Sequence, residues 1–306
     1  MRSQSFIIGF ETQRRQVAKP QRKLAKATFA SLHLYVFALI FSSTLTAQRV
    51  AILTPDKVDA SRAFAEKLES ALADNHKVVD DSLSETAYRS VTTENPFNLT
   101  TDESRRIGAV IGCDYFVLVR AATLRRSSTL RSEYYESHAI IYAISSRTGR
   151  LVFWRLEHFE AGKPADAIKL MNGSVEGLAT EISTTLKTTA KSEIAEPAPP
   201  PIEEVPDANS PEAKNFRAPV PYRRIKPAYT TEAGFYDIKA TVDILVDLDA
   251  AGAITRTENV RWAGFGLDES VEQVVRQMNW RPAERNGKTL PMRFLLRYNF
   301  KKIDKD

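Results

Sequence analysis

The amino-acid sequence predicts an α+β protein in which two folded domains are joined by a proline-rich linker. In the first half of the chain, short apolar runs of strand length alternate with stretches whose apolar residues recur at helical spacing. In the last third, apolar and polar residues alternate from Ile238 to Leu248, which is the period of a strand with one buried face. Residues 191–216, between these regions, contain six prolines and carry a net charge of −4. This composition predicts an extended segment that does not collapse.

Residues 1–47 have the layout of a secretory signal. Basic residues come first, an apolar run follows from Ala27 to Phe41, and small residues lead to Ala47. We expect cleavage between Ala47 and Gln48, because a strand-like run begins at once and leaves no spacer between a membrane and a fold. The alternative is an uncleaved anchor, since about 20 residues suffice to span a bilayer. Cleavage predicts a periplasmic protein, and retention predicts a single-pass protein of the inner membrane.

The basic charge of the chain is concentrated in this leader. The whole sequence has a formal net charge of +5, and the leader holds seven basic residues and one acidic residue. Without the leader the protein is close to neutral. The charge therefore gives no indication of nucleic-acid binding, and membrane contact is expected only through an uncleaved leader.

Residues 48–190 are expected to form an α/β sandwich with the order β-α-β-α-β-β-β-α. Thr100 and Glu103 have the spacing of a capping box, which predicts the start of a helix that runs through Ile111. The turn at 147–150 predicts an antiparallel strand pair. The expected strands are 50–53, 77–80, 115–119, 133–145 and 151–156, and the other expected helices are 60–73, 84–91 and 165–187.

Three short motifs in this domain resemble those of one group of envelope proteins. They are Arg-Val-Ala-Ile-Leu-Thr-Pro at 49–55, Ile-Gly-Cys-Asp-Tyr-Phe-Val-Leu-Val at 111–119, and Thr-Gly-Arg-Leu-Val-Phe-Trp at 148–154. These segments are similar to the first strand, a later strand and the hairpin of the CsgG, LpoB and TolB N-terminal group. The resemblance implies an anticodon-binding-like sandwich that acts in envelope assembly or protein contacts.

Residues 217–306 are expected to form a second domain with the order β-β-α-β. The apolar spacing after Phe265 predicts an amphipathic helix, and Asn286 with Gly287 predicts a tight turn. The expected elements are a strand at 238–248, a turn at 249–252, a strand at 254–262, a helix from about 267 to 278, and a last strand at 292–300.

Motifs throughout this second domain have the order and spacing of one known family. The residues are Pro227, Tyr229, Gly252, Gly266, Leu267, Asp268, Trp280, Pro282, Ala283, Asn286 and Gly287. In this pattern the segment from about 219 to 302 resembles the C-terminal domain of TonB proteins. Two positions depart from the family, because Thr230 stands where Pro is usual and Ala240 where Gly is frequent. The resemblance implies a TonB-type β-β-α-β fold.

The resemblance also implies capture of an extended peptide. TonB domains pair their last strand with a short segment of an outer-membrane transporter, and an open strand edge offers the unpaired main-chain groups that such pairing needs. Arg293, Arg297 and Lys301 would share one face of the strand, either beside an acidic partner or as protection against aggregation. The implied binding edge consists of Met292, Arg293, Phe294, Leu295, Leu296, Arg297, Tyr298, Asn299 and Phe300.

Energy transduction is a separate question, because TonB itself depends on an anchor with a Ser-x-x-x-His pattern. Ser31 and His33 are two residues apart and cannot share that helical face. We therefore expect a non-catalytic periplasmic adaptor that binds a protein partner, with a role in TonB-linked transmembrane transport. The alternatives are a structural or assembly factor of the envelope, which could be a homo-oligomer, and an inner-membrane-anchored TonB-like energy transducer.

No pattern in the sequence predicts enzymatic activity. The four histidines, at 33, 76, 138 and 158, lack the spacing of metal ligands and are expected at surface or hairpin positions, so neither a metal nor a cofactor is predicted. Cys113 is the only cysteine and is expected to be a small buried hydrophobe. Trp154, Trp262 and Trp280 are expected in cores.

Overall fold

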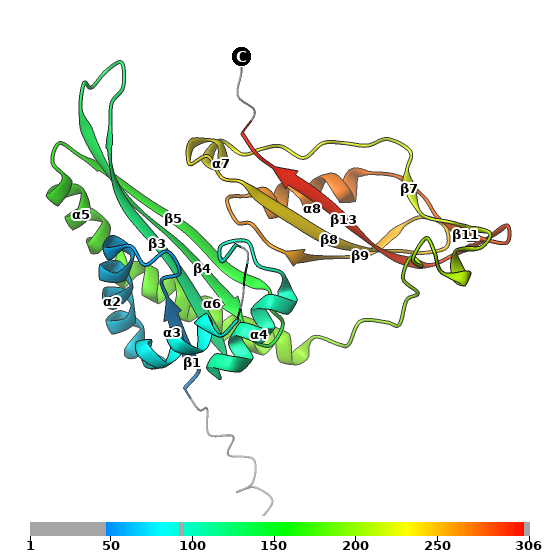
Figure 1. Cartoon of the computed structure of the whole chain (residues 1–306), viewed down its shortest axis with the longest axis horizontal. Coiled ribbons are helices and arrows are strands. Elements are labelled where there is room, and N and C mark those ends of the chain that lie inside the picture. Colours follow the sequence, from blue (N-terminus) through cyan, green and yellow to red (C-terminus); the bar gives the residue numbers. More distant parts are fainter. Residues whose placement is uncertain (1–46, 92, 94, 303–306) are drawn as a thin grey trace, which may run out of the picture. The chain divides into compact units, whose positions relative to one another are not determined.

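A computed structural model of the chain describes residues 47–91, 93 and 95–302. The predicted leader lies outside these residues, apart from Ala47. The described elements form an N-terminal α/β domain and a C-terminal β-rich domain, which confirms the predicted α+β class (Figure 1).

The N-terminal domain is built on a five-stranded sheet with the order β2-β1-β3-β4-β5. Strand β1 is parallel to β2 and β3, whereas β3, β4 and β5 follow one another as an antiparallel meander. Strands β3 and β5 are longer than predicted, because pairing with β4 continues through distal residues of mixed polarity, beyond the apolar runs. The strands are β1 (Arg49–Leu53), β2 (Lys77–Val78), β3 (Tyr115–Arg126), β4 (Tyr134–Ser145) and β5 (Leu151–Ala161).

Five helices accompany this sheet in the described chain. The predicted capping box at Thr100 and Glu103 is present at the start of α4. The predicted helix at 165–187 is instead two helices separated at Ser174, and the second of them continues to Ala195. The helices are α2 (Asp59–Ala73), α3 (Asp81–Arg89), α4 (Thr101–Ile111), α5 (Pro164–Gly173) and α6 (Val175–Ala195).

The two faces of this sheet have different coverings. Helices α2, α5 and α6 cover one face, where Phe64, Leu68 and Ile182 pack against Val117 and other strand residues (Figure 1). The opposite face is covered in part by α3 and α4 and in part by residues of the C-terminal domain. Strand β4 is therefore buried along most of its length.

The C-terminal domain contains the four predicted elements in the predicted order. Strands β8 (Ala240–Leu248), β9 (Ile254–Arg261) and β13 (Met292–Phe300) form a sheet with the order β13-β8-β9, and helix α8 (Leu267–Gln277) packs on it. The predicted turn at Asn286 and Gly287 joins two short strands with both residues at positive φ. The remaining elements are η1 (Pro211–Ala213), β6 (Phe216–Arg217), β7 (Val220–Pro221), α7 (Thr231–Phe235), β10 (Trp280–Arg281), β11 (Ala283–Arg285) and β12 (Lys288–Leu290).

Residues of the two domains share one hydrophobic cluster, which the sequence did not predict. Tyr142 of β4 packs against Trp262, with ring centroids 5.4 Å apart, and Trp154 of β5 packs against Phe265 at 5.1 Å. The amide of Asn98 donates to the carbonyl oxygen of Trp262 at 2.6 Å. These contacts supply the second covering of the sheet.

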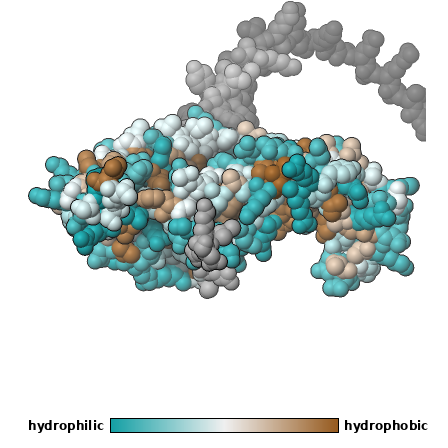
Figure 2. Space-filling model, turned by 90° about the horizontal axis from the view of Figure 1, so that it is seen from above, coloured by the Kyte–Doolittle hydropathy of each residue, from teal (hydrophilic) through white to brown (hydrophobic). Residues whose placement is uncertain are grey.

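The hydrophobic residues left on the surface are dispersed. Large exposed apolar side chains belong to many different elements, among them Val58, Leu83, Val110 and Leu130. The face shown in Figure 2 is mainly hydrophilic, with hydrophobic patches separated from one another. Scattered single apolar residues are normal on protein surfaces and do not indicate a binding site. Within 47–91, 93 and 95–302, no helix has both the length and the apolarity needed to cross a membrane.

Candidate functional site

Strand β13 forms one edge of its sheet. It pairs with β8 along all nine residues, from Met292 opposite Leu248 to Phe300 opposite Ala240. The strand has the bounds predicted from the sequence. Its other side faces no complete strand among the described residues, so the predicted edge exists as a geometric feature.

The pairing of β13 with β8 determines which of its residues direct their main-chain N–H and C=O groups away from β8. Both the N–H and the C=O of Arg293 bond to a segment on the side away from β8. In an antiparallel pair, alternate residues direct their main-chain groups to the same side. Leu295, Arg297 and Asn299 therefore also direct theirs outward, and no described segment forms a main-chain hydrogen bond with them there. These three residues form the open part of the edge.

The arginines of β13 are paired with carboxylates of β8. Arg293 donates two hydrogen bonds to Asp247, at 2.7 and 2.8 Å, and Arg297 donates two to Asp243, at 2.7 and 2.9 Å. Both aspartates are almost fully buried. The domain itself therefore supplies the carboxylates beside these arginines, although the side chain of Arg297 remains 57% exposed.

Charge balance at Asp243 depends on two arginines. Burial opposes ionisation of this carboxyl, but hydrogen bonds and charge from Arg297 and Arg261 outweigh it and lower its pKa. The same hydrogen bond from Arg297 to Asp243 raises the pKa of the guanidinium. The pair therefore stays charged at neutral pH and holds the outward strand against β8.

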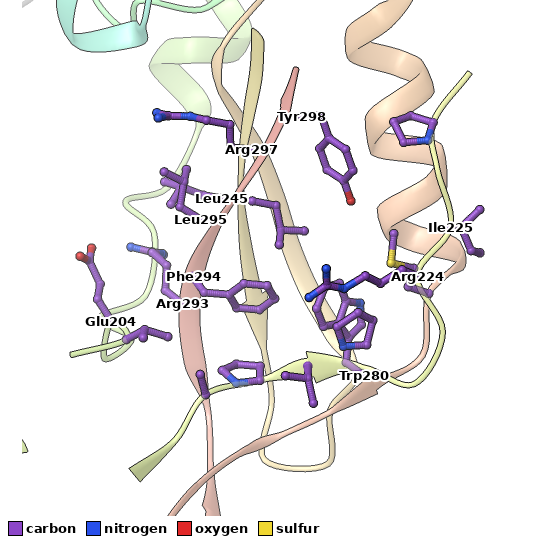
Figure 3. A pocket seen from close by; sticks show the side chains of 18 of the residues that line it. Glu204, Arg224, Ile225, Leu245, Trp280, Arg293, Phe294, Leu295, Arg297 and Tyr298 are labelled. Atoms are coloured by element: carbon purple, nitrogen blue, oxygen red, sulfur yellow. The ribbon is translucent and has the colours of Figure 1, made fainter. Parts of the chain in front are cut away.

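A groove with a mainly apolar lining and a cavity volume of about 820 Å³ runs along β13. Phe294 and Tyr298 point toward this groove, whereas Arg293, Leu295 and Arg297 point to the other face (Figure 3). The Phe294 ring packs against the Trp280 indole with centroids 4.9 Å apart. The other lining residues include Val205, Ala218, Pro219, Val220, Ile225, Met278 and Leu296.

The groove continues at the end of the strand into a second cavity of about 500 Å³. Tyr298, Lys226 and Pro227 line both cavities. Phe300 stacks on Tyr229 at the second cavity, with centroids 6.3 Å apart. A strand that paired with the open edge could thus place alternate side chains along one continuous apolar wall.

The other residues of the predicted family motif have mainly structural positions. The Asp268 carboxylate accepts main-chain N–H bonds from Ala263 and Gly264, at 2.6 to 3.1 Å, and closes the loop before α8. Burial raises the pKa of Asp268 to about 7. Tyr229 donates to the carbonyl oxygens of Ala233 and Ile238. Trp280 and Ala283 are buried, and Leu267 is a fully buried residue of the helix.

Thr230 departs from the family pattern for a visible reason. Its hydroxyl donates to the carbonyl oxygen of Phe265 at 2.6 Å and accepts from the N–H of Ala233 at 3.2 Å. It is the N-cap of α7, a role that proline cannot fill through a side-chain oxygen.

One prediction about a histidine needs correction. His76 was expected at a surface or hairpin position but is buried, whereas His138 lies in the predicted strand pair and is also buried. His76 forms a 3.0 Å hydrogen bond with Ser183 of α6, and His138 lies in β4 near Glu136. Burial lowers the pKa of both histidines, so the neutral form is favoured. The prediction that Cys113 is buried is confirmed.

Sequence reasoning missed two parts of the site. Residues 203–205 of the linker pair with β13, and residues 218–221 and Arg224, from segment 218–224, form part of the groove wall. The Ile-Glu-Glu-Val run at 202–205 has a β-branched residue at each end, which could have indicated that it pairs with a strand. The surrounding prolines instead favoured the prediction of an unpaired linker. Segment 218–224 carries no such signal.

Comparison with known proteins identifies the C-terminal domain. Residues 225–301 match the family model described as Gram-negative bacterial TonB protein C-terminal. The solved TonB C-terminal domain of Pseudomonas aeruginosa is 20% identical, with coverage of 32% of this chain and 93% of that chain and a TM-score of 0.25. The LpoB C-terminal domain from Salmonella enterica is 16% identical, with coverage of 40% and 91% and a TM-score of 0.25.

A third solved structure, the hypothetical protein CT253 from Chlamydia trachomatis, is 10% identical, with coverage of 46% of this chain and 98% of that chain and a TM-score of 0.31. No curated protein matched the sequence. The family match confirms the resemblance predicted from the motifs, because residues 225–301 carry the sequence pattern of the TonB C-terminal family.

Proposed function

We propose that this protein is a non-catalytic component of the Gram-negative envelope that binds an extended segment of a partner protein along β13. The observation that carries the proposal is the open edge at Leu295, Arg297 and Asn299 beside an apolar groove. The TonB C-terminal match supports it, since that family implies strand pairing with an outer-membrane transporter. A transporter segment is therefore our candidate partner.

Main-chain pairing alone would give weak binding. Each of the three open residues offers one N–H and one C=O, and a hydrogen bond contributes about 1 kcal/mol net. Association itself costs at least about 4 kcal/mol. Burial of one side chain the size of leucine adds about 1.5–3 kcal/mol. A partner strand should therefore carry apolar residues at the alternate positions that face Phe294 and Tyr298.

The proposal can be tested with peptides selected from a displayed library of random extended sequences. Residues 48–306 serve as the target, and the affinity of each selected peptide is measured by fluorescence polarisation. Leu295→Pro removes an outward N–H that a partner would use, and it leaves the ladder to β8 intact because proline is tolerated at such edge positions. We expect at least a tenfold loss of affinity.

Leu295→Ala is the matched control, because it shortens the same side chain and keeps the N–H. Its affinity should stay within about threefold of the wild type. Equal affinity of wild type and Leu295→Pro, with unchanged circular dichroism, would show that peptides bind elsewhere.

We also propose a periplasmic location, which depends on removal of the leader. N-terminal sequencing of the mature protein should give Gln48 as the first residue. An intact leader would instead support the inner-membrane-anchored alternative.

A further inference from the structure

The linker of this chain is paired with the candidate binding edge. The N–H of Arg293 donates to the carbonyl oxygen of Glu203 at 2.8 Å, and the N–H of Val205 donates to the carbonyl oxygen of Arg293 at 3.0 Å. These two bonds place Glu204 opposite Arg293 in a parallel bridge. The first outward position of β13 is therefore occupied by a segment of the same chain, which we call the internal strand (residues 203–205).

The side chains of the internal strand match both sides of the edge. Val205 lines the apolar groove and packs against the hydrophobic core. Glu204 lies near Arg293 at the edge of β13, and its charge helps to raise the pKa of that guanidinium after the larger effect of Asp247 (Figure 3). Glu203 forms an ion pair with Arg285 of β11. The segment thus makes main-chain, apolar and charged contacts of the kind a partner strand would make.

The chain limits this contact to two main-chain bonds. Pro291 has no N–H, so it cannot donate a bond that would extend the ladder toward the start of β13. In the other direction Pro206 fixes φ near −65°, away from the roughly −120° of a parallel strand. The chain then turns, with the N–H of Ser210 donating to the carbonyl oxygen of Asp207 at 2.9 Å. The internal strand consequently stops before Leu295 and is held weakly.

A partner strand that occupied the whole edge would need the position held by the internal strand. Its main-chain groups would compete for Arg293, and its apolar side chains would meet Val205 in the groove. We propose that the internal strand is an autoinhibitory segment that a partner must displace, an inference that rests on the proposed function of β13. The free energy needed to displace the internal strand reduces the apparent affinity for every partner strand that reaches Arg293. Partners that also fill the groove are therefore favoured.

Val205→Pro tests this inference, because it removes the N–H that bonds to Arg293 and keeps an apolar side chain. Ala198→Pro is the matched control, since Ala198 is exposed in the same linker and forms no described hydrogen bond. Both variants are made in residues 48–306. Equal far-UV circular dichroism spectra for all three proteins will show that the fold is retained.

Two measurements are then compared in the three proteins. The first is amide hydrogen exchange at Arg293, whose N–H donates to Glu203. Exchange should be slow in the wild type and Ala198→Pro and at least tenfold faster in Val205→Pro, because loss of the Val205 bond releases the internal strand and with it the Glu203 acceptor. The second is the affinity of library-selected peptides, which should be about tenfold higher for Val205→Pro than for the other two proteins.

Each outcome decides between the two proposals. Equally fast exchange at Arg293 in all three proteins would show that the internal strand is not formed, and equal peptide affinity would show that it does not compete. Either result overturns the autoinhibitory role and leaves peptide capture intact, provided that Leu295→Pro still weakens binding. If exchange at Arg293 is slow but no peptide binds any of the proteins, both proposals are wrong.

Discussion

Substitution of the glycine in the β8–β9 turn can separate the effect of steric packing on stability from the effect of backbone conformation. Gly252 has φ +88°, and a Cβ atom built there would lie 2.3 Å from the carbonyl oxygen of Trp280. Gly287 has φ +77°, and its Cβ would meet no atom within 4 Å. An L-residue in this conformation costs about 1–2 kcal/mol, offset by about 0.4–1 kcal/mol from the unfolded chain. Gly287→Ala should therefore destabilise the protein by about 1 kcal/mol.

Gly252→Ala carries the same conformational cost and a main-chain clash in addition. Relief of such a clash requires a backbone shift that costs about 1–3 kcal/mol, so the total loss should be about 3 kcal/mol. The free energies of unfolding are measured by urea titration followed by tryptophan fluorescence. Equal losses for Gly252→Ala and Gly287→Ala would refute the reasoning, because the contacts with Trp280 and Pro282 occur at Gly252 and not at Gly287.

The same pair of variants connects the turn to the groove. The Trp280 indole packs on Phe294, so displacement of the Trp280 backbone should alter the wall that receives the partner. Gly252→Ala should weaken the binding of library-selected peptides under conditions in which it is fully folded, and Gly287→Ala should not.

Three further predictions concern buried carboxylates, and each is measured by urea unfolding. Burial raises the pKa of Asp268 to about 7, from an ordinary value of 3.8. The contribution of Asp268 to stability is therefore greatest at low pH and is lost as pH rises through 7. From pH 8 to pH 5, the free energy of unfolding of the wild type should increase by about 2–3 kcal/mol relative to that of Asp268→Asn. The pKa of Asp243 is lowered, so Asp243→Asn should cost about 2 kcal/mol at pH 7, and the difference should shrink below about pH 4. Tyr236→Phe removes a 2.6 Å hydrogen bond to the buried Glu136 and should cost about 1–3 kcal/mol.

The fold of the C-terminal domain could be predicted because its signals are local. Alternation over 238–248 sets the buried face of β8, and Asn286 with Gly287 supplies the positive φ values that a tight turn requires. The helix α8 buries Leu267, Val271 and Val275 at the predicted spacing. Each of these features depends on neighbours within one element, so one sequence was sufficient.

The contacts between distant segments could not be predicted in this way. Trp262 was expected in a core, but together with Phe265 it also covers β4 and β5 of the other domain. An apolar residue shows the same pattern whichever surface buries it. The break between α5 and α6 at Ser174 was missed for another reason, because the helical periodicity of the sequence continues across it.

The same distinction applies to the binding edge and limits what the family match can indicate about the partner. The family match covers residues 225–301, and its motif residues lie mostly in turns and in the core. The internal strand at 203–205 and the groove wall at 218–224 lie before that match. Strand pairing itself is largely independent of side chains, since every residue except proline offers the same main-chain groups. Discrimination between partners must then arise from the groove and from competition with the internal strand, so partner preference has to be measured on this chain and on its own linker.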